Sequence, residues 1–214
     1  MVLYPVVIVL SAFLLFLVQP LMGKVLLPWF GGGASVWSAS VLFFQVLLLI
    51  GHAYSHGITE RLSRRRQTGV HVGLLAVSLV GVLVTALRWR TPLMPGPAWQ
   101  PQRTGDPLVR ILVILTVSVG LPYFVLSTTS PLLQRWALDE MARGTRASPY
   151  PFYALSNIGS MVALLGYPTL VQPNLDLPIQ SWVWTAGYGL FVVGVGALAW
   201  RQSRTAERPR RKRE

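Results

Sequence analysis

Long apolar stretches recur along the chain and are separated by short segments that carry most of its charge. A helix needs about 20 apolar residues to cross the hydrocarbon layer of a bilayer. Six such helices take up most of the 214 residues, so we predict an all-α integral membrane protein. The pattern places the spans near residues 3–23, 36–57, 69–88, 108–130, 152–171 and 181–200, in one transmembrane domain over 1–200 that is followed by a basic tail over 201–214.

Composition and charge support this class. Only 12% of the residues are charged, whereas a soluble domain carries about 25%. The formal net charge of +12 does not indicate a nucleic-acid partner, because the basic residues gather in two loops and the tail. Such segments stay in the cytoplasm, so we predict a multi-pass protein of a bacterial-type inner membrane with both termini cytoplasmic. The tail should also contact anionic lipids. The residues are Arg61, Arg64, Arg65, Arg66, Arg135, Arg143, Arg146, Arg201, Arg204, Arg208, Arg210, Arg211, Lys212 and Arg213.

Three short internal matches occur in the same order in the two halves of the chain, one for each helix of a three-helix unit. Because three is odd, two such units lie in the membrane with opposite orientations, which is the inverted repeat found in many secondary transporters. We therefore predict a three-plus-three inverted repeat. The matches are QPLMGK at 19–24 with SPLLQR at 130–135, LLIGHA at 48–53 with ALLGYP at 163–168, and ALRWR at 86–90 with ALAWR at 197–201.

Polar residues interrupt the first and fourth spans. Pro20 removes a backbone hydrogen bond, so we predict a break near the end of the first helix. Gln19 and Lys24 flank it; they either bond a neighbouring helix and reach the headgroups, or line a polar cavity for an anionic or polar substrate. Pro122 should disturb the fourth helix near Ser118. The hydroxyls that follow either support this kink or form a binding site, and they belong to Ser127, Thr128, Thr129 and Ser130.

The fifth and sixth spans carry small residues at helical spacing, which predicts close helix packing. Asn157 lies beside the first set and must find a partner, because an unpaired amide in lipid costs several kcal/mol. It is the best single candidate for a polar site residue. The residues predicted to pack are Ser156, Gly159, Ser160, Ala163, Gly187 and Gly194.

No catalytic site is evident in the sequence, so we do not predict an enzyme, and the sequence implies no particular cofactor. Cysteine is absent, and none of the 7 acidic residues lies within a predicted span. The three consecutive glycines at 31–33 lack a preceding strand and the spacing of a phosphate-binding loop. We also predict no metal site, although His52, His56 and His71 gather near one end of the second and third spans and are weak candidates.

Two stretches carry a family resemblance. Residues 19–56 and 148–173 resemble the membrane part of bacterial fused proteins, in which a transporter-like region of the major facilitator type precedes a spermidine-synthase-like domain. The resemblance implies half of a major-facilitator-type fold. No synthase domain follows Glu214, so we do not expect aminopropyl transfer. The matching positions are Gln19, Pro20, Lys24, Gly31, Gly32, Gly33, Trp37, Phe44 and Gln45 in the first stretch, and Ser156, Asn157, Gly159 and Ser160 in the second.

Three functions remain compatible with these observations. The one that we predict is an accessory or scaffold subunit that docks against a larger membrane complex, and the other two are alternatives. The second is a small transporter that works as a homodimer. The third is a membrane anchor for a separately encoded enzyme of the spermidine-synthase type. In the transporter hypothesis the side chains facing a midline cavity are Gln19, Lys24, Gln45, Ser127, Thr128 and Asn157.

Overall fold

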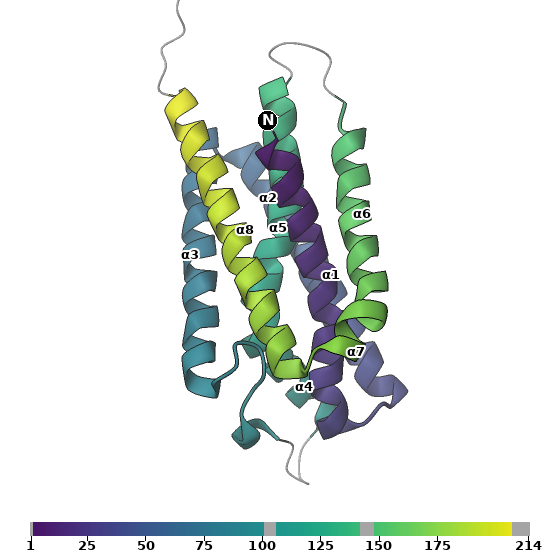
Figure 1. Ribbon diagram of the computed structural model, residues 1–214. Coiled ribbons are helices and arrows are strands. Elements are labelled where there is room, and N and C mark those ends of the chain that lie inside the picture. The colour runs from purple at the N-terminus through teal and green to yellow at the C-terminus, as the bar shows by residue number, and fades with distance from the viewer. Residues whose placement is uncertain (1, 101–105, 142–147, 207–214) are drawn as a thin grey trace, which may run out of the picture.

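The computed structural model describes residues 2–100, 106–141 and 148–206, the last four of these by their backbone alone, and every regular element in them is helical. Figure 1 shows long helices that run side by side. Their bounds are α1 (Leu3–Phe30), α2 (Ala34–Arg61), α3 (Arg64–Trp89), a 3₁₀ turn η1 (Pro97–Trp99), α4 (Pro107–Leu115), a π-helical turn η2 (Thr116–Gly120), α5 (Leu121–Met141), α6 (Tyr150–Gly166), a second π-helical turn η3 (Tyr167–Val171), α7 (Gln172–Asn174) and α8 (Leu177–Ala206).

Six helical segments among the described residues are long and apolar enough to cross a membrane, which confirms the prediction of a multi-pass helical protein. The fourth runs from Pro107 to Met141 through α4, η2 and α5, and the fifth from Tyr150 to Asn174 through α6, η3 and α7. One end of the bundle, at the top of Figure 1, holds the start of α1 and the end of α8. We call it the terminal end and the opposite end the distal end.

The predicted break at Pro20 is wrong. Helix α1 continues through Pro20 and Pro28 to Phe30, and α5 likewise continues through Pro131. A proline removes one backbone hydrogen bond from a helix, and packed neighbours on several sides hold the remaining turns in place. The irregularity predicted at Pro122 is present instead as the π-helical turn η2, which contains Ser118. Such a turn widens the helix where the proline ring crowds the preceding carbonyl.

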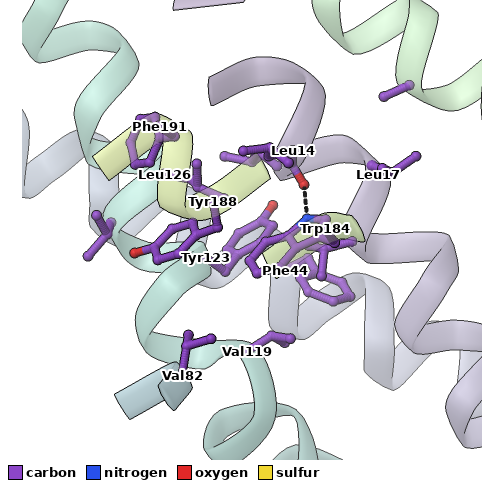
Figure 2. Close-up of a cluster of buried hydrophobic side chains, with 14 of the residues drawn as sticks. Leu14, Leu17, Phe44, Val82, Val119, Tyr123, Leu126, Trp184, Tyr188 and Phe191 are labelled. Atoms are coloured by element: carbon purple, nitrogen blue, oxygen red, sulfur yellow. Dashed lines mark hydrogen bonds between the residues drawn. The ribbon is translucent and has the colours of Figure 1, made fainter. Parts of the chain in front are cut away.

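Helix α1 is the centre of the bundle. In its most apolar window 61% of the residues are buried, against 17% for the segment that begins with α6. It packs against α5, α6 and α8, while α2 packs on α5 and α3 packs on α8. Figure 2 shows part of this core, in which the indole N–H of Trp184 donates to the carbonyl oxygen of Leu14 at 2.9 Å. The ring of Trp184 stacks on Tyr188 with centroids 5.3 Å apart. The central helix is therefore held by polar as well as apolar contacts.

The terminal end of α5 bonds directly to α1 and α3, and α8 is joined to α1 beside it. Asp139 of α5 accepts a hydrogen bond from Arg64 of α3 at 2.6 Å, and Glu140 of α5 accepts one from the hydroxyl of Tyr4 in α1 at 3.0 Å. Gln202 of α8 donates to the same Tyr4 hydroxyl. The indole of Trp136, which is fully buried, donates to Gln67 Oε1 of α3 at 3.1 Å. These bonds fix the helix ends that surround the site described next.

Candidate functional site

A groove of about 720 Å³ lies between α1, α2, α5 and α6 in the terminal half of the bundle. The lining residues nearest the distal end on α1, α2 and α5 are apolar and form what we call its floor: Leu15, Phe16, Leu48 and Leu126. Towards the terminal end the lining becomes polar, and among the described residues that line the groove none is Asp or Glu. The polar lining residues are Ser11, His52, Ser55, His56, Thr59, Ser127, Ser130, Gln134, Arg135, Tyr153, Ser156, Asn157 and Ser160.

Two glycines set the width of this groove. A Cβ atom placed on Gly51 would lie 1.9 Å from the hydroxyl oxygen of Ser127, so α2 touches α5 at this point. A Cβ atom on Gly159 would lie 2.7 Å from the carbonyl oxygen of Val9, so α6 touches the backbone of α1. Helix α2 is thus held against α5, and α6 against α1. The groove is the space that remains between these two helix pairs.

Several hydroxyls along the lining are already bonded to their own helices. Ser127 donates to the carbonyl of Phe124 at 2.8 Å, and Ser160 donates to that of Ser156 at 3.0 Å. Ser11 donates across to the carbonyl of Leu126 at 3.1 Å and so ties α1 to α5. This pattern supports the helices near their proline residues. Asn157, by contrast, has no hydrogen-bond partner among the residues that the structure describes.

Beyond the apolar floor, the distal half of the seam between α1 and α5 is closed. Gln19, about one helical turn beyond Phe16, donates to the hydroxyl of Tyr123 at 3.2 Å. The ring of Tyr123 meets that of Phe44 from α2 with centroids 4.9 Å apart. Three helices therefore meet at Tyr123, and the groove ends before this contact.

The structure separates the six residues predicted to face one cavity. Ser127 and Asn157 line the groove together. Gln19 lies in the closed half, Lys24 lies further along α1 towards the distal end, and neither lines the groove. Gln45 is exposed on α2 outside it, and Thr128 is fully buried with its hydroxyl bonded to the carbonyl of Val125 at 2.8 Å.

Of the six residues predicted to pack closely, four contact neighbouring helices and two line the groove. Gly159 and Ala163 are buried against their neighbours, and Gly187 and Gly194 of α8 face Leu14 and Val7 of α1, respectively. A Cβ atom on Gly194 would lie 2.8 Å from a methyl carbon of Val7. Ser156 and Ser160 instead line the groove.

The three histidines occupy two different environments. His52 and His56 line the groove, and Nδ1 of His52 donates to the carbonyl of Leu48 at 2.8 Å because a carbonyl can only accept. His71 is fully buried on α3, and its Nε2 lies 2.9 Å from the hydroxyl of Thr129. Among the described residues, no group of three or more His, Cys, Asp or Glu side chains is arranged to hold a metal ion.

The end of the groove nearest the terminal end, which we call its mouth, carries the permanent positive charge of Arg135. The Nε atom of Arg135 lies 3.5 Å from a carboxylate oxygen of Asp139, and the side chain remains 67% exposed. The other oxygen of Asp139 is held more tightly by Arg64, at 2.6 Å. One carboxylate therefore serves two guanidinium groups. On the opposite wall, His56 lies 3.4 Å from Glu60 at the exposed end of α2.

Ser11, Gln134 and Arg135 line the groove but were not predicted as site residues. A usable pattern exists on α2, where His52, Ser55, His56 and Thr59 share one helical face and all four line the groove. The corresponding face of α5 also contains Pro131 and Leu138, so its polar residues do not form a continuous pattern that the sequence would reveal.

No family model matches the chain, no curated protein matches it, and no solved structure matches it. The family resemblance of residues 19–56 and 148–173 therefore stays an expectation.

Proposed function

We propose that this protein is a small membrane transporter that works as a homodimer, with the groove of each copy forming half of the substrate path. The observation that carries this proposal is the groove itself. It is polar towards the terminal end, apolar at its floor, and closed beyond the floor by Tyr123 and its partners. A site that opens towards one side of a membrane and is closed towards the other is what a transporter needs in one of its states.

The packing of the helices supports an inverted repeat. In such a repeat α1, α2 and α3 correspond to α5, α6 and α8. The contact of α1 with α6 then corresponds to the contact of α5 with α2, and the contact of α1 with α8 corresponds to the contact of α5 with α3. All four contacts are present, and so are the contacts of α1 with α5 and of α3 with α8, which this correspondence leaves unchanged. This is the symmetry expected of one half of a major-facilitator-type transporter.

The charge distribution supports an orientation. Arg61, Arg64, Arg65 and Arg135 all lie at the terminal end of the helices, and basic segments remain in the cytoplasm. In the proposed bacterial-type inner membrane, the groove then opens to the cytoplasm and the contact at Tyr123 lies towards the outside. Both chain termini are cytoplasmic in this arrangement.

The uncovered polar side chains support a second copy. Asn157 on α6 and Gln45 on α2 are exposed next to exposed apolar residues such as Ile158 and Val46, and a polar group facing lipid is costly. A twofold partner placed over the groove would cover both walls and turn two half-open grooves into one path.

The accessory-subunit hypothesis is a second candidate that a specific observation favours. The segment that begins with α6 has only 17% of its apolar window buried, and this face suits a foreign helix as well as a second copy. The enzyme-anchor hypothesis remains a prediction that no contact in the described residues favours.

The first test is native mass spectrometry of the particle extracted in mild detergent, together with thiol cross-linking of Asn157→Cys. The chain has no cysteine, so the introduced thiol is unique. We expect a homodimer that Asn157→Cys cross-links, while Val80→Cys, exposed on the distant helix α3, gives no cross-link. A stoichiometric foreign subunit would replace the transporter proposal with the accessory one. A monomer would contradict both.

A further inference from the structure

We propose that the groove binds a small anion that carries a carboxylate or phosphate group, and that Arg135 supplies the principal charge that holds it. This inference rests on the proposed function only in treating the groove as a substrate site. Three features of the groove carry it: the charge balance at the mouth, the hydrogen-bond donors in the wall, and the apolar floor.

The charge balance at the mouth is positive. Arg64 and Arg135 share the single carboxylate of Asp139, and the shorter contact, at 2.6 Å, goes to Arg64. The longer contact, at 3.5 Å, engages only the Nε side of the Arg135 guanidinium. Glu60, which lies beside His56, and Glu140, which bonds to Tyr4, are near the mouth, but neither lines the groove. Because an Arg side chain stays charged at any physiological pH, Arg135 places a positive charge on the lining itself. No carboxylate among the described residues lines the groove to neutralise it.

The wall of the groove is rich in donors. Asn157 has two amide hydrogens without a partner among the described residues, and it lies on α6, the helix that faces the groove from the side of α1. Ser55 and Ser156 each carry a lining hydroxyl that donates no hydrogen bond to a described residue. Charge-assisted donors such as guanidinium groups suit the planar oxygen pair of a carboxylate or the oxygens of a phosphate. Among the described lining residues a cationic ligand would meet no carboxylate, because Glu60 lies beside His56 outside the lining.

The volume and floor limit the size of the anion. Small-molecule sites have volumes of roughly 300–1,000 Å³, and the groove, at about 720 Å³, lies within this range. The side chains of Phe16 and Leu48 belong to its apolar floor. A short carbon skeleton suits the floor while its charged group stays near Arg135. The same chemistry belongs to a soluble carboxylate or phosphate and to the phosphate of a lipid headgroup.

The experiment measures binding and transport separately on the full chain. Equilibrium binding of labelled inorganic phosphate, succinate and citrate is measured in detergent, with labelled spermidine as the cationic counterpart. The variants are Arg135→Gln, which removes the charge, and Arg135→Lys, which keeps it. Arg65→Gln is the control, because Arg65 is an exposed residue near the terminal end that does not line the groove. Uptake of the same compounds is measured in proteoliposomes.

We expect at least one anion to bind and its affinity to fall about tenfold or more in Arg135→Gln, since the variant loses a charge-assisted hydrogen bond to the anion. Arg135→Lys should recover part of the loss, and Arg65→Gln should bind like the wild type. Displacement of labelled phosphate by short-chain phosphatidylglycerol, with no binding of succinate or citrate, would support the same chemistry and identify a lipid as its source.

Two outcomes would overturn this inference: no binding of any of the anions, or equal binding by the wild type and Arg135→Gln. Binding and uptake of spermidine alone would overturn the anion inference and leave the transporter proposal standing. Anion binding that depends on Arg135 but is never followed by uptake would support the anion inference and contradict the transporter proposal.

Discussion

Along the seam between α1 and α5, the terminal half holds an open polar groove, whereas the distal half is closed by packed side chains. In the terminal half, small residues such as Ser127 and Ser130 face the space between the helices. In the distal half, Tyr123 fills the same space and bonds to Gln19. The two halves differ in the volume of the α5 side chains at the seam as well as in polarity. Side-chain size therefore contributes to which part of one helix pair forms a site and which part is closed.

The largest expected difference between regions is in access to water. Asn157 lines the groove, whereas Leu165, two turns further along α6, is exposed outside it. Asn157→Cys should react fully with a water-soluble maleimide, because a hydrated groove allows the thiolate to form. Leu165→Cys should not react, because its surroundings are lipid. Labelling is measured by mass spectrometry after reconstitution. Equal labelling of both cysteines would remove the distinction between the groove and the lipid-facing surface.

The next effect concerns the packing that borders the groove. Gly159→Leu places a side chain against the carbonyl of Val9, and the backbone of α1 cannot move aside easily. We expect a loss of about 3 kcal/mol in the free energy of unfolding. The control is Gly166→Leu on the same helix, where nothing lies within 4 Å of the added Cβ atom. Thermal unfolding in detergent compares the two variants, and equal stability would mean that α6 does not depend on this contact.

The smallest effect concerns the closed half. Tyr123→Phe keeps the ring that contacts Phe44 but removes the acceptor for Gln19, and we expect a loss of about 1 kcal/mol. Tyr54→Phe is the matched control, because the buried hydroxyl of Tyr54 has no partner among the described residues. Adding Gln19→Ala to Tyr123→Phe should cost less than the sum of the single changes. Full additivity, measured by unfolding in detergent, would show that the bond does not contribute to the seal.

The sequence was sufficient to predict six spanning helices, because apolar length alone determines whether a segment crosses a membrane. It did not predict that the first helix continues beyond residue 23. Pro20 and Lys24 suggested a boundary near residue 23, yet α1 continues to Phe30 because neighbouring helices support it. Prolines in membrane helices are tolerated when surrounding groups compensate for the lost bond.

The candidate site was predicted only in part. Ser127 and Asn157 were selected as polar residues in apolar spans, and both line the groove. Gln19 was selected for the same reason but lies in the closed half, where Tyr123 accepts its hydrogen bond. Polarity in a span indicates that a partner is needed, but it does not say whether that partner is a neighbouring helix or a ligand. Only the rotation of each helix about its axis decides between the two, and this rotation depends on packing across the whole bundle.

The central position of α1 has a consequence for biosynthesis. This helix is made before the other five spans, yet the indole that bonds to Leu14 belongs to Trp184, 170 residues later. At about 5–20 residues per second, the ribosome needs roughly 10–30 seconds to bridge that interval. During this time α1 lies in the membrane without the helix that completes its surroundings. Its strongly apolar sequence keeps α1 stable in lipid during this interval. Because Trp184 belongs to α8, assembly of the bundle must finish after translation of that helix.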